Sequence, residues 1–141
     1  MRIRRLLAVW LLSLAGLLST ACAPVPVTDI DHQTVYREDE KPLTLEDMTR
    51  AIRLAALRQD WKQVEVIEPG HIVATQRDED NTKFVSVDIL YTTTEYSIHY
   101  KDSKGMKYNA ANRTIGHHYK SMLNDLHEEI AEMIQVVTPG S

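Results

Sequence analysis

The chain has few of the residues that cross-link a fold or hold a cofactor through the backbone. Its 141 residues include one cysteine, so an internal disulfide is impossible. It has five glycines, and neither a G-x-S-x-G elbow nor a glycine-rich phosphate loop occurs in it. These absences argue against a disulfide-stapled domain, a hydrolase of the serine-elbow type and a nucleotide-binding loop. We therefore expect no enzymatic activity and no cofactor.

Long apolar runs are also missing, because the longest one, Leu6–Leu18, covers thirteen residues. A membrane-spanning helix needs about 20 apolar residues, so this run does not predict one. It follows the basic start Met1–Arg5 and precedes the small residues Ser19–Ala21. A positive start, an apolar stretch and small residues before a cut are typical of a secretory signal. Residues 1–21 are therefore predicted to be a signal peptide.

The only cysteine, Cys22, comes directly after those small residues, in Leu18-Ser19-Thr20-Ala21-Cys22. This arrangement resembles the lipobox of bacterial lipoproteins. The resemblance implies that Cys22 carries acyl chains, starts the mature chain and attaches it to a membrane in the bacterial cell envelope. The next residue is Ala23, whereas aspartate there is the usual signal for retention in the inner membrane. The resemblance thus implies the outer membrane, with the protein facing the periplasm.

Positive charge is scarce once the signal peptide is removed. Loss of its three arginines leaves thirteen basic residues against twenty acidic ones, a net charge of −7. A nucleic-acid partner needs a basic footprint, so nucleic acid is not an expected partner. The net charge also argues against electrostatic adhesion to anionic lipid, which leaves the lipid on Cys22 as the expected anchor.

The segment that follows Cys22 is predicted to be a flexible tether over residues 22–42. It contains three prolines and the charge run Arg37–Lys41, and its few apolar residues are too scattered for a stripe. An extended linker of about 20 residues reaches about 60 Å at most. We therefore expect the folded part to stand well away from the membrane.

Two segments have the apolar spacing of amphipathic helices. Leu43–Gln59 repeats apolar residues every three or four positions, and Thr44 and Asp47 near its start have almost the spacing of a capping box. His117–Val137 carries a longer stripe and is followed by Pro139-Gly140. Both stripes predict helices that bury one side against another layer.

Between these helices the apolar period changes to two, which is typical of half-buried strands. Four strands are predicted at Trp61–Glu68, Ile72–Arg77, Lys83–Tyr91 and Glu95–Lys101. The order predicts an α+β fold over residues 43–138, a two-layer α-β-β-β-β-α sandwich. Its sheet would be an antiparallel meander with both helices on one face.

A second resemblance involves Tyr96–Ser103, Tyr108 and the helix start at His118-Tyr119. Together these stretches resemble parts of small bacterial lipoproteins of unassigned function. The resemblance brings no activity with it.

The best candidate working surface is the sheet face turned away from the helices. If Tyr91 pairs with Tyr96, Asp88 lies opposite His99 and Ser86 lies opposite Lys101 on that face. No further amphipathic segment remains to cover it. We therefore predict a partner-binding face made of Asp88, His99, Lys101 and Ser86, with ordinary solvated cross-strand pairs as the alternative.

The six histidines do not form a pattern that predicts a metal site. His118 and His127 are nine residues apart and point to opposite sides of a helix, and His117 and His127 are about 15 Å apart along it. His118 and Met122 would make only half of a soft copper site. The carboxylates Glu128, Glu129 and Glu132 are expected on a solvated helix face.

The sequence thus favours a lipid-anchored periplasmic protein that is a non-enzymatic interaction or envelope-assembly module. Its partners would be the membrane, through Cys22, and another envelope protein or the cell wall. The alternative is a small-molecule or metal-binding periplasmic protein, which a deep apolar pocket would favour.

Overall fold

The computed structural model describes residues 23–141, so the predicted signal peptide and Cys22 lie outside the described residues. The described chain has an α+β fold. Its elements are β1 (Val25–Pro26), β2 (Ile30–Thr34), α1 (Leu45–Arg58), β3 (Gln63–Glu68), β4 (His71–Arg77), β5 (Phe84–Tyr91), β6 (Glu95–Lys104), β7 (Thr114–Ile115) and α2 (His118–Val136).

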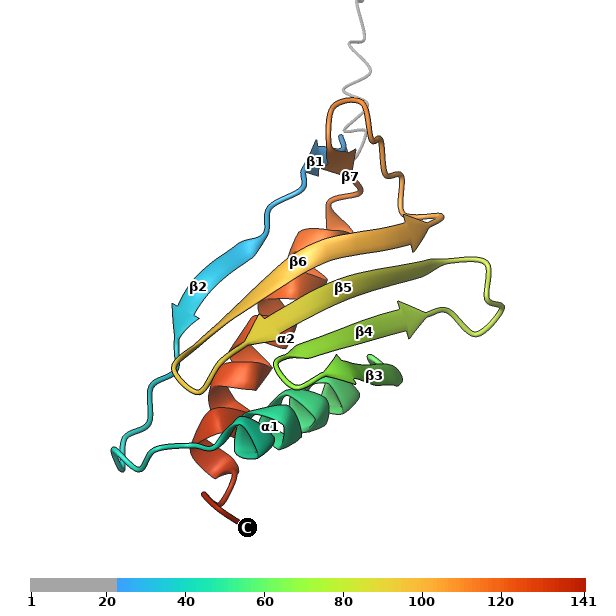
Figure 1. The fold of residues 1–141 in the computed structure, drawn as a ribbon. Coiled ribbons are helices and arrows are strands. Elements are labelled where there is room, and N and C mark those ends of the chain that lie inside the picture. Colours follow the sequence, from blue (N-terminus) through green and yellow to red (C-terminus); the bar gives the residue numbers. More distant parts are fainter. Residues whose placement is uncertain (1–22) are drawn as a thin grey trace, which may run out of the picture.

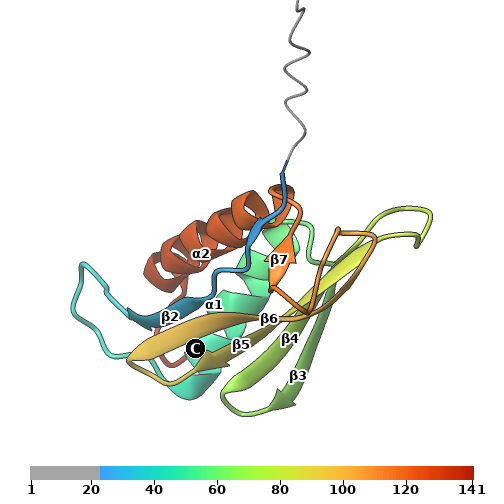
Figure 2. The ribbon, with the colours of Figure 1, turned by 90° about the horizontal axis from the view of Figure 1, so that it is seen from above.

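The main sheet has five antiparallel strands in the order β2-β6-β5-β4-β3. Strands β3 to β6 form the predicted meander, in which each strand pairs with the next along the chain. Both helices lie on one face of this sheet (Figures 1 and 2). The predicted two-layer α+β fold is therefore confirmed, with β1, β2 and β7 added to it.

Helix α1 begins at Leu45, two residues after the predicted start at Leu43, and the capping box expected from Thr44 and Asp47 is present. The backbone N–H of Asp47 donates to Thr44 Oγ1 at 3.1 Å, and the backbone N–H of Thr44 donates to the Asp47 carboxylate at 2.9 Å. These bonds satisfy two N–H groups that have no partner inside the helix. The helix then buries an apolar stripe made of Met48, Ala51, Ile52, Ala55 and Ala56.

The core lies between the helices and the sheet, and its hairpin register is the predicted one. Tyr91 pairs with Tyr96, Ile89 with Ile98, and Asp88 with His99. Helix α2 covers the same face with Tyr119, Leu123, Leu126, Ile130, Met133 and Ile134. Alternation along β5 and β6 therefore sends one set of side chains to the helices and the other set to the opposite face.

One predicted pair is wrong, because Ser86 lies opposite Asp102 and not opposite Lys101. The register shifts between Ser86 and Val87, whose partner is Tyr100. Lys101 is thus an extra residue in β6, as in a β-bulge, where two residues of one strand face one residue of its partner.

The predicted flexible tether over residues 22–42 is also wrong, since most of this segment packs on the domain. Strand β2 pairs with β6, with Ile30 opposite Ile98, and β1 pairs with β7, with Val25 opposite Ile115. The physical reason is the free edge of β6, which offers backbone hydrogen bonds to any extended segment beside it. The irregular register between Ile30 and Gln33 explains why the apolar residues of this segment show no period.

Arg37 fastens the segment to the end of α2. Its Nη1 donates to the carbonyls of Ile134 and Val137, and its Nη2 lies 2.6 Å from Oδ2 of Asp39. The side chain is 7% exposed, and a cation at a helix C-terminus also complements the helix dipole. The hydrogen bond from Arg37 holds the pKa of Asp39 at about 2. The folded unit therefore starts well before residue 43.

Candidate functional site: the open sheet face

The sheet face turned away from the helices, here called the open sheet face, carries mostly polar side chains. Figure 1 looks onto this face, and no element of residues 23–141 lies over it. Its side chains alternate with core residues along β4, β5 and β6. They are His71, Val73 and Thr75 on β4, Ser86 and Asp88 on β5, and Ser97, His99 and Lys101 on β6.

Asp88 is the centre of an ion cluster that joins three strands. Its Oδ1 lies 2.7 Å from Nε2 of His71 and 3.5 Å from Nζ of Lys101. A carboxylate can only accept, so His71 Nε2 carries the hydrogen of this bond. The His71 and Asp88 side chains are each 23% exposed. The cluster is therefore half-buried in the face, with Lys101 at its wetter edge.

His99, the predicted neighbour of Asp88, makes its own ion pair elsewhere. Its Nε2 lies 2.6 Å from Oδ1 of Asp31, which belongs to β2. The sequence prediction placed Asp31 in a tether and so missed this pair. Asp88 and His99 are cross-strand neighbours as predicted, but β2 provides the closest carboxylate to the His99 ring.

Ser86 is held inside the sheet and is not free to contact a partner. Its Oγ lies 2.7 Å from Oγ1 of Thr75, and both residues are buried. The structure thus brings Asp88, His99 and Lys101 together on the open sheet face. Ser86 is buried beneath that surface and bonds to Thr75. His71 is the residue that sequence reasoning missed, because the predicted strand Ile72–Arg77 starts one residue after it, whereas β4 includes it.

A hollow of about 250 Å³ lies at one end of the open sheet face, beside the β5–β6 turn. Its lining includes His32, Glu95, His99 and the side chain of Leu90, which is 41% exposed. His32 Nδ1 and Glu95 Oε1 are 3.2 Å apart. The hollow therefore combines apolar surface with the polar groups of His32, Glu95 and His99.

The other candidate groups have structural surroundings. Glu129, predicted to be solvated, is buried against α1, where its Oε1 lies 3.0 Å from Arg58 Nε without the alignment of a hydrogen bond. His127 Nδ1 is 2.9 Å from the hydroxyl of Tyr96, and burial lowers the pKa of the imidazole. His118 and Met122 line one surface hollow, but within residues 23–141 no three His, Cys, Asp or Glu side chains gather closely enough to hold a metal ion.

In the part of the chain that the structure describes, neither helix has the length and apolar character needed to cross a membrane. Comparison with family models, curated proteins and solved structures finds no match to this chain.

Proposed function

We propose that the protein is a lipid-anchored periplasmic lipoprotein, a non-enzymatic interaction or assembly module. Its open sheet face would contact another envelope protein or the cell wall. The observation that carries this proposal is the asymmetry of the sheet, whose one face is filled by two helices while the other is polar and uncovered by residues 23–141.

The chemistry of the face suits recognition. Strands hold the polar side chains of Asp31, Asp88, His99 and Lys101 in fixed positions, so little ordering remains to be done when a partner binds. Complementary charges across an interface add specificity and speed association. Exposed ion pairs contribute little to folding stability. These side chains would therefore contribute more to the free energy of binding a partner than to that of folding.

The hollow near His99 suits a protein partner of the open sheet face better than a small molecule bound there. Pockets for small molecules are concave and usually about 300–1,000 Å³ in volume. The hollow on the open sheet face is about 250 Å³ and is lined in part by polar groups. Such a surface accommodates a side chain of a protein partner more readily than a whole ligand.

Membrane fractionation tests the anchor. Replacement Cys22→Ala removes the acylation site, and each buried acyl CH₂ contributes about 0.8 kcal/mol to membrane binding. We expect the variant to leave the membrane fraction while its melting temperature after purification stays unchanged. A variant that still sediments with membranes in high salt would contradict the anchor.

In-cell cross-linking from the open sheet face tests the contact surface. Asp88→Lys reverses the central charge of the face, and Glu132→Lys, on the exposed side of α2, is its matched control. We expect the first variant to lose a cross-linked partner that the second retains, while both variants stay folded at the temperature of the experiment. Equal capture by both variants would remove this face from consideration.

A further inference from the structure

Charge is segregated along this chain in a way that the net charge conceals. Residues 103–124 form a run of 22 residues without aspartate or glutamate, although the whole chain has 20 acidic residues. The run is basic, and its cations are Lys104, Lys107, Arg113 and Lys120, with His117 and His118 beside them. All the acidic residues of the chain therefore lie outside this segment, here called the basic segment.

The basic segment lies where the described chain begins. It contains β7, whose Ile115 pairs with Val25 of β1, and the backbone N–H of Val27 donates to the Arg113 carbonyl at 2.8 Å. Figure 1 shows β1 and β7 together at one end of the molecule, with the C-terminus at the opposite end. The basic segment thus lies at the end of the molecule opposite to the C-terminus.

An anchor at Cys22 would be joined to this end by a short connection, because only two residues stand between Cys22 and Val25 in the sequence. Three steps of about 3.8 Å between consecutive Cα atoms span about 11 Å at most. A flexible tether of some 20 residues would have let the domain rotate freely relative to the membrane. Because β1 and β2 are paired with β7 and β6, only a short connection to the anchor remains. An acyl anchor on Cys22 therefore brings the basic end of the molecule to the membrane.

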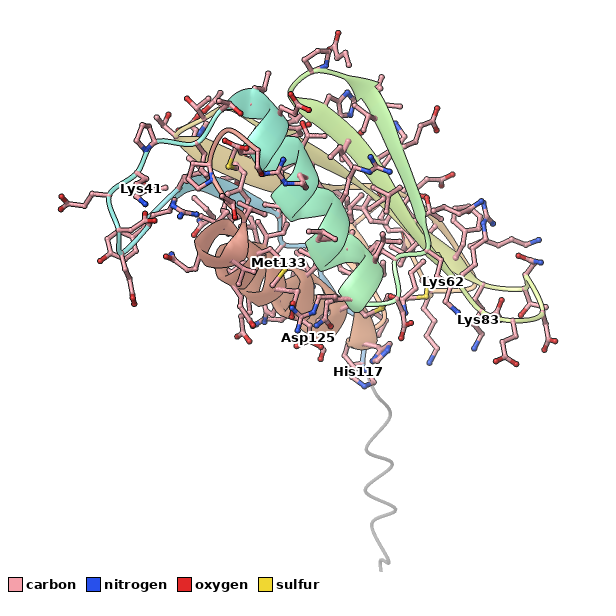
Figure 3. All side chains as sticks on the ribbon, turned by 90° about the horizontal axis from the view of Figure 1, so that it is seen from below. Lys41, Lys62, Lys83, His117, Asp125 and Met133 are labelled. Atoms are coloured by element: carbon pink, nitrogen blue, oxygen red, sulfur yellow. The ribbon has the colours of Figure 1, made fainter. Side chains whose placement is uncertain are left out.

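The surface at this end has exposed cations around a hollow. The hollow, about 200 Å³, is lined by Lys83, Lys107, His117 and His118 together with Met106 and two glycines. Figure 3 shows His117, Lys62 and Lys83 toward this end and Lys41 far from it. Helix α2 also starts here without a side-chain cap and without an acidic residue in its first turn, so its free N–H groups add positive potential.

Carboxylates also lie near this surface and neutralise part of it, among them Asp29, Asp78 and Asp125, which Figure 3 labels beside His117. Asp29 Oδ2 is 3.4 Å from Nη2 of Arg113, and Asp78 accepts the backbone N–H of Lys83. Among the described residues, Lys104, Lys107 and Lys120 form no ion pair. Three lysines of the basic segment are therefore available to an external anion.

We propose that this basic end docks onto the anionic phospholipid headgroups of the leaflet that holds the acyl chains of Cys22. The proposal rests on the anchor proposed above and adds an orientation to it. Docking holds the domain against the bilayer surface and leaves the open sheet face, which lies on β4 to β6, accessible to the periplasm. Each lysine or arginine near an anionic surface favours the docked orientation by about fivefold.

The test uses the acylated mature protein, starting at Cys22, in vesicles of phosphatidylethanolamine and phosphatidylglycerol. The vesicles carry a quencher linked to lipid headgroups. Because acylation occupies Cys22, an introduced cysteine is the only free thiol and can carry a fluorophore. Ala110→Cys places it in the basic segment, and Thr93→Cys places it in the β5–β6 turn at the other end (Figure 1). We expect several-fold stronger quenching at position 110 than at position 93. Equal quenching of the two labels on vesicle-bound protein would overturn the docking and leave the anchor intact, whereas protein that does not stay with the vesicles would overturn both.

Charge reversals separate docking from mere proximity. Lys107→Glu and Lys120→Glu lie in the basic segment, and Lys41→Glu, an equally exposed lysine at the other end, is the matched control. Each of the first two should lower the ratio of docked to undocked protein about fivefold, with melting temperatures unchanged, and the control should not lower it. Vesicles of phosphatidylethanolamine alone should erase the difference. Equal ratios for all three variants, or equal quenching with and without phosphatidylglycerol, would overturn the proposal.

Discussion

The two faces of the five-stranded sheet are built from the same strands but have opposite properties. Along β5, Val85, Val87 and Ile89 point to the helices and are almost completely buried, whereas Asp88 and Leu90 point the other way and are partly exposed. The helix-covered face provides apolar burial, at about 25 cal/mol for each Å² removed from water. The open sheet face provides polar pairs that contribute about 0.2–1 kcal/mol each. One face therefore holds the fold together, while the other is free to be used.

The largest expected effect comes from the helix-covered face. Ile89→Ala removes a fully buried side chain between Ile72 and Ile98 and should lower the free energy of unfolding by about 2–5 kcal/mol. Its matched control is Leu90→Ala in the same strand, 41% exposed on the open sheet face, which should cost under about 1 kcal/mol. Urea unfolding of both variants measures the difference. Similar losses of unfolding free energy would contradict the view that only the helix-covered face stabilises the fold.

The next largest effect tests whether the segment before α1 packs against the helix layer. Arg37→Ala leaves the carbonyls of Ile134 and Val137 without their buried donor, and one unsatisfied group costs about 1–3 kcal/mol. We expect a loss of about 2–3 kcal/mol in urea unfolding, with Lys41→Ala close to neutral as the control. If Arg37→Ala leaves the free energy of unfolding unchanged, the packing of this segment is refuted and the flexible tether is supported.

Buried charge in the helix layer should respond to acid. Asp47 is 1% exposed, and the backbone N–H of Thr44, followed by that of Gly140, lowers its pKa from 3.8 to about 2. Because the folded state holds this carboxylate ionised, its stabilisation is complete above the ordinary pKa and is lost as the pH falls toward 2. Melting temperatures across this range should converge for wild type and Asp47→Asn. A gap that stays constant down to pH 2 would contradict this assignment.

The smallest effect is expected for the carboxylate on the open sheet face. Asp88→Asn weakens the contacts with His71 and Lys101, which are partly exposed and screened by solvent, so it should cost about 1 kcal/mol or less. Asp47→Asn is the matched variant, since both changes remove one carboxylate charge. Urea unfolding of the two variants compares their losses of unfolding free energy. A loss above about 2 kcal/mol would show that the open sheet face is also structural.

Local rules were enough to predict the helices, the meander and its register. Thr44 and Asp47 predicted the start of α1, and the apolar match of Tyr91, Ile89 and Val87 with their partners predicted the β5–β6 pairing. A shift of one residue would have turned one apolar set to water. Such patterns can be read from the sequence because neighbours along one strand or helix decide them.

The neighbours of the functional groups could not be read in this way. The bulge at Lys101 places Asp102 opposite Ser86, whose hydroxyl contacts Thr75 of β4. The partners of Asp88 and His99 are His71, which the predicted strand left out, and Asp31 of the predicted tether. Nothing in the period of the sequence marks these contacts, because each joins segments that are distant along the chain.

The sequence by itself determined the α+β class, the polar character of the open sheet face and the basic segment, since composition and alternation are properties of the chain. Only the tertiary structure decided that residues 25–37 join the domain. The free edge of β6 pairs with β2, and Arg37 reaches the carbonyls at the end of α2. Unpaired backbone groups at a sheet edge and a helix end exist only after the fold has formed, so a segment without a pattern of its own is placed by the partners that the fold provides.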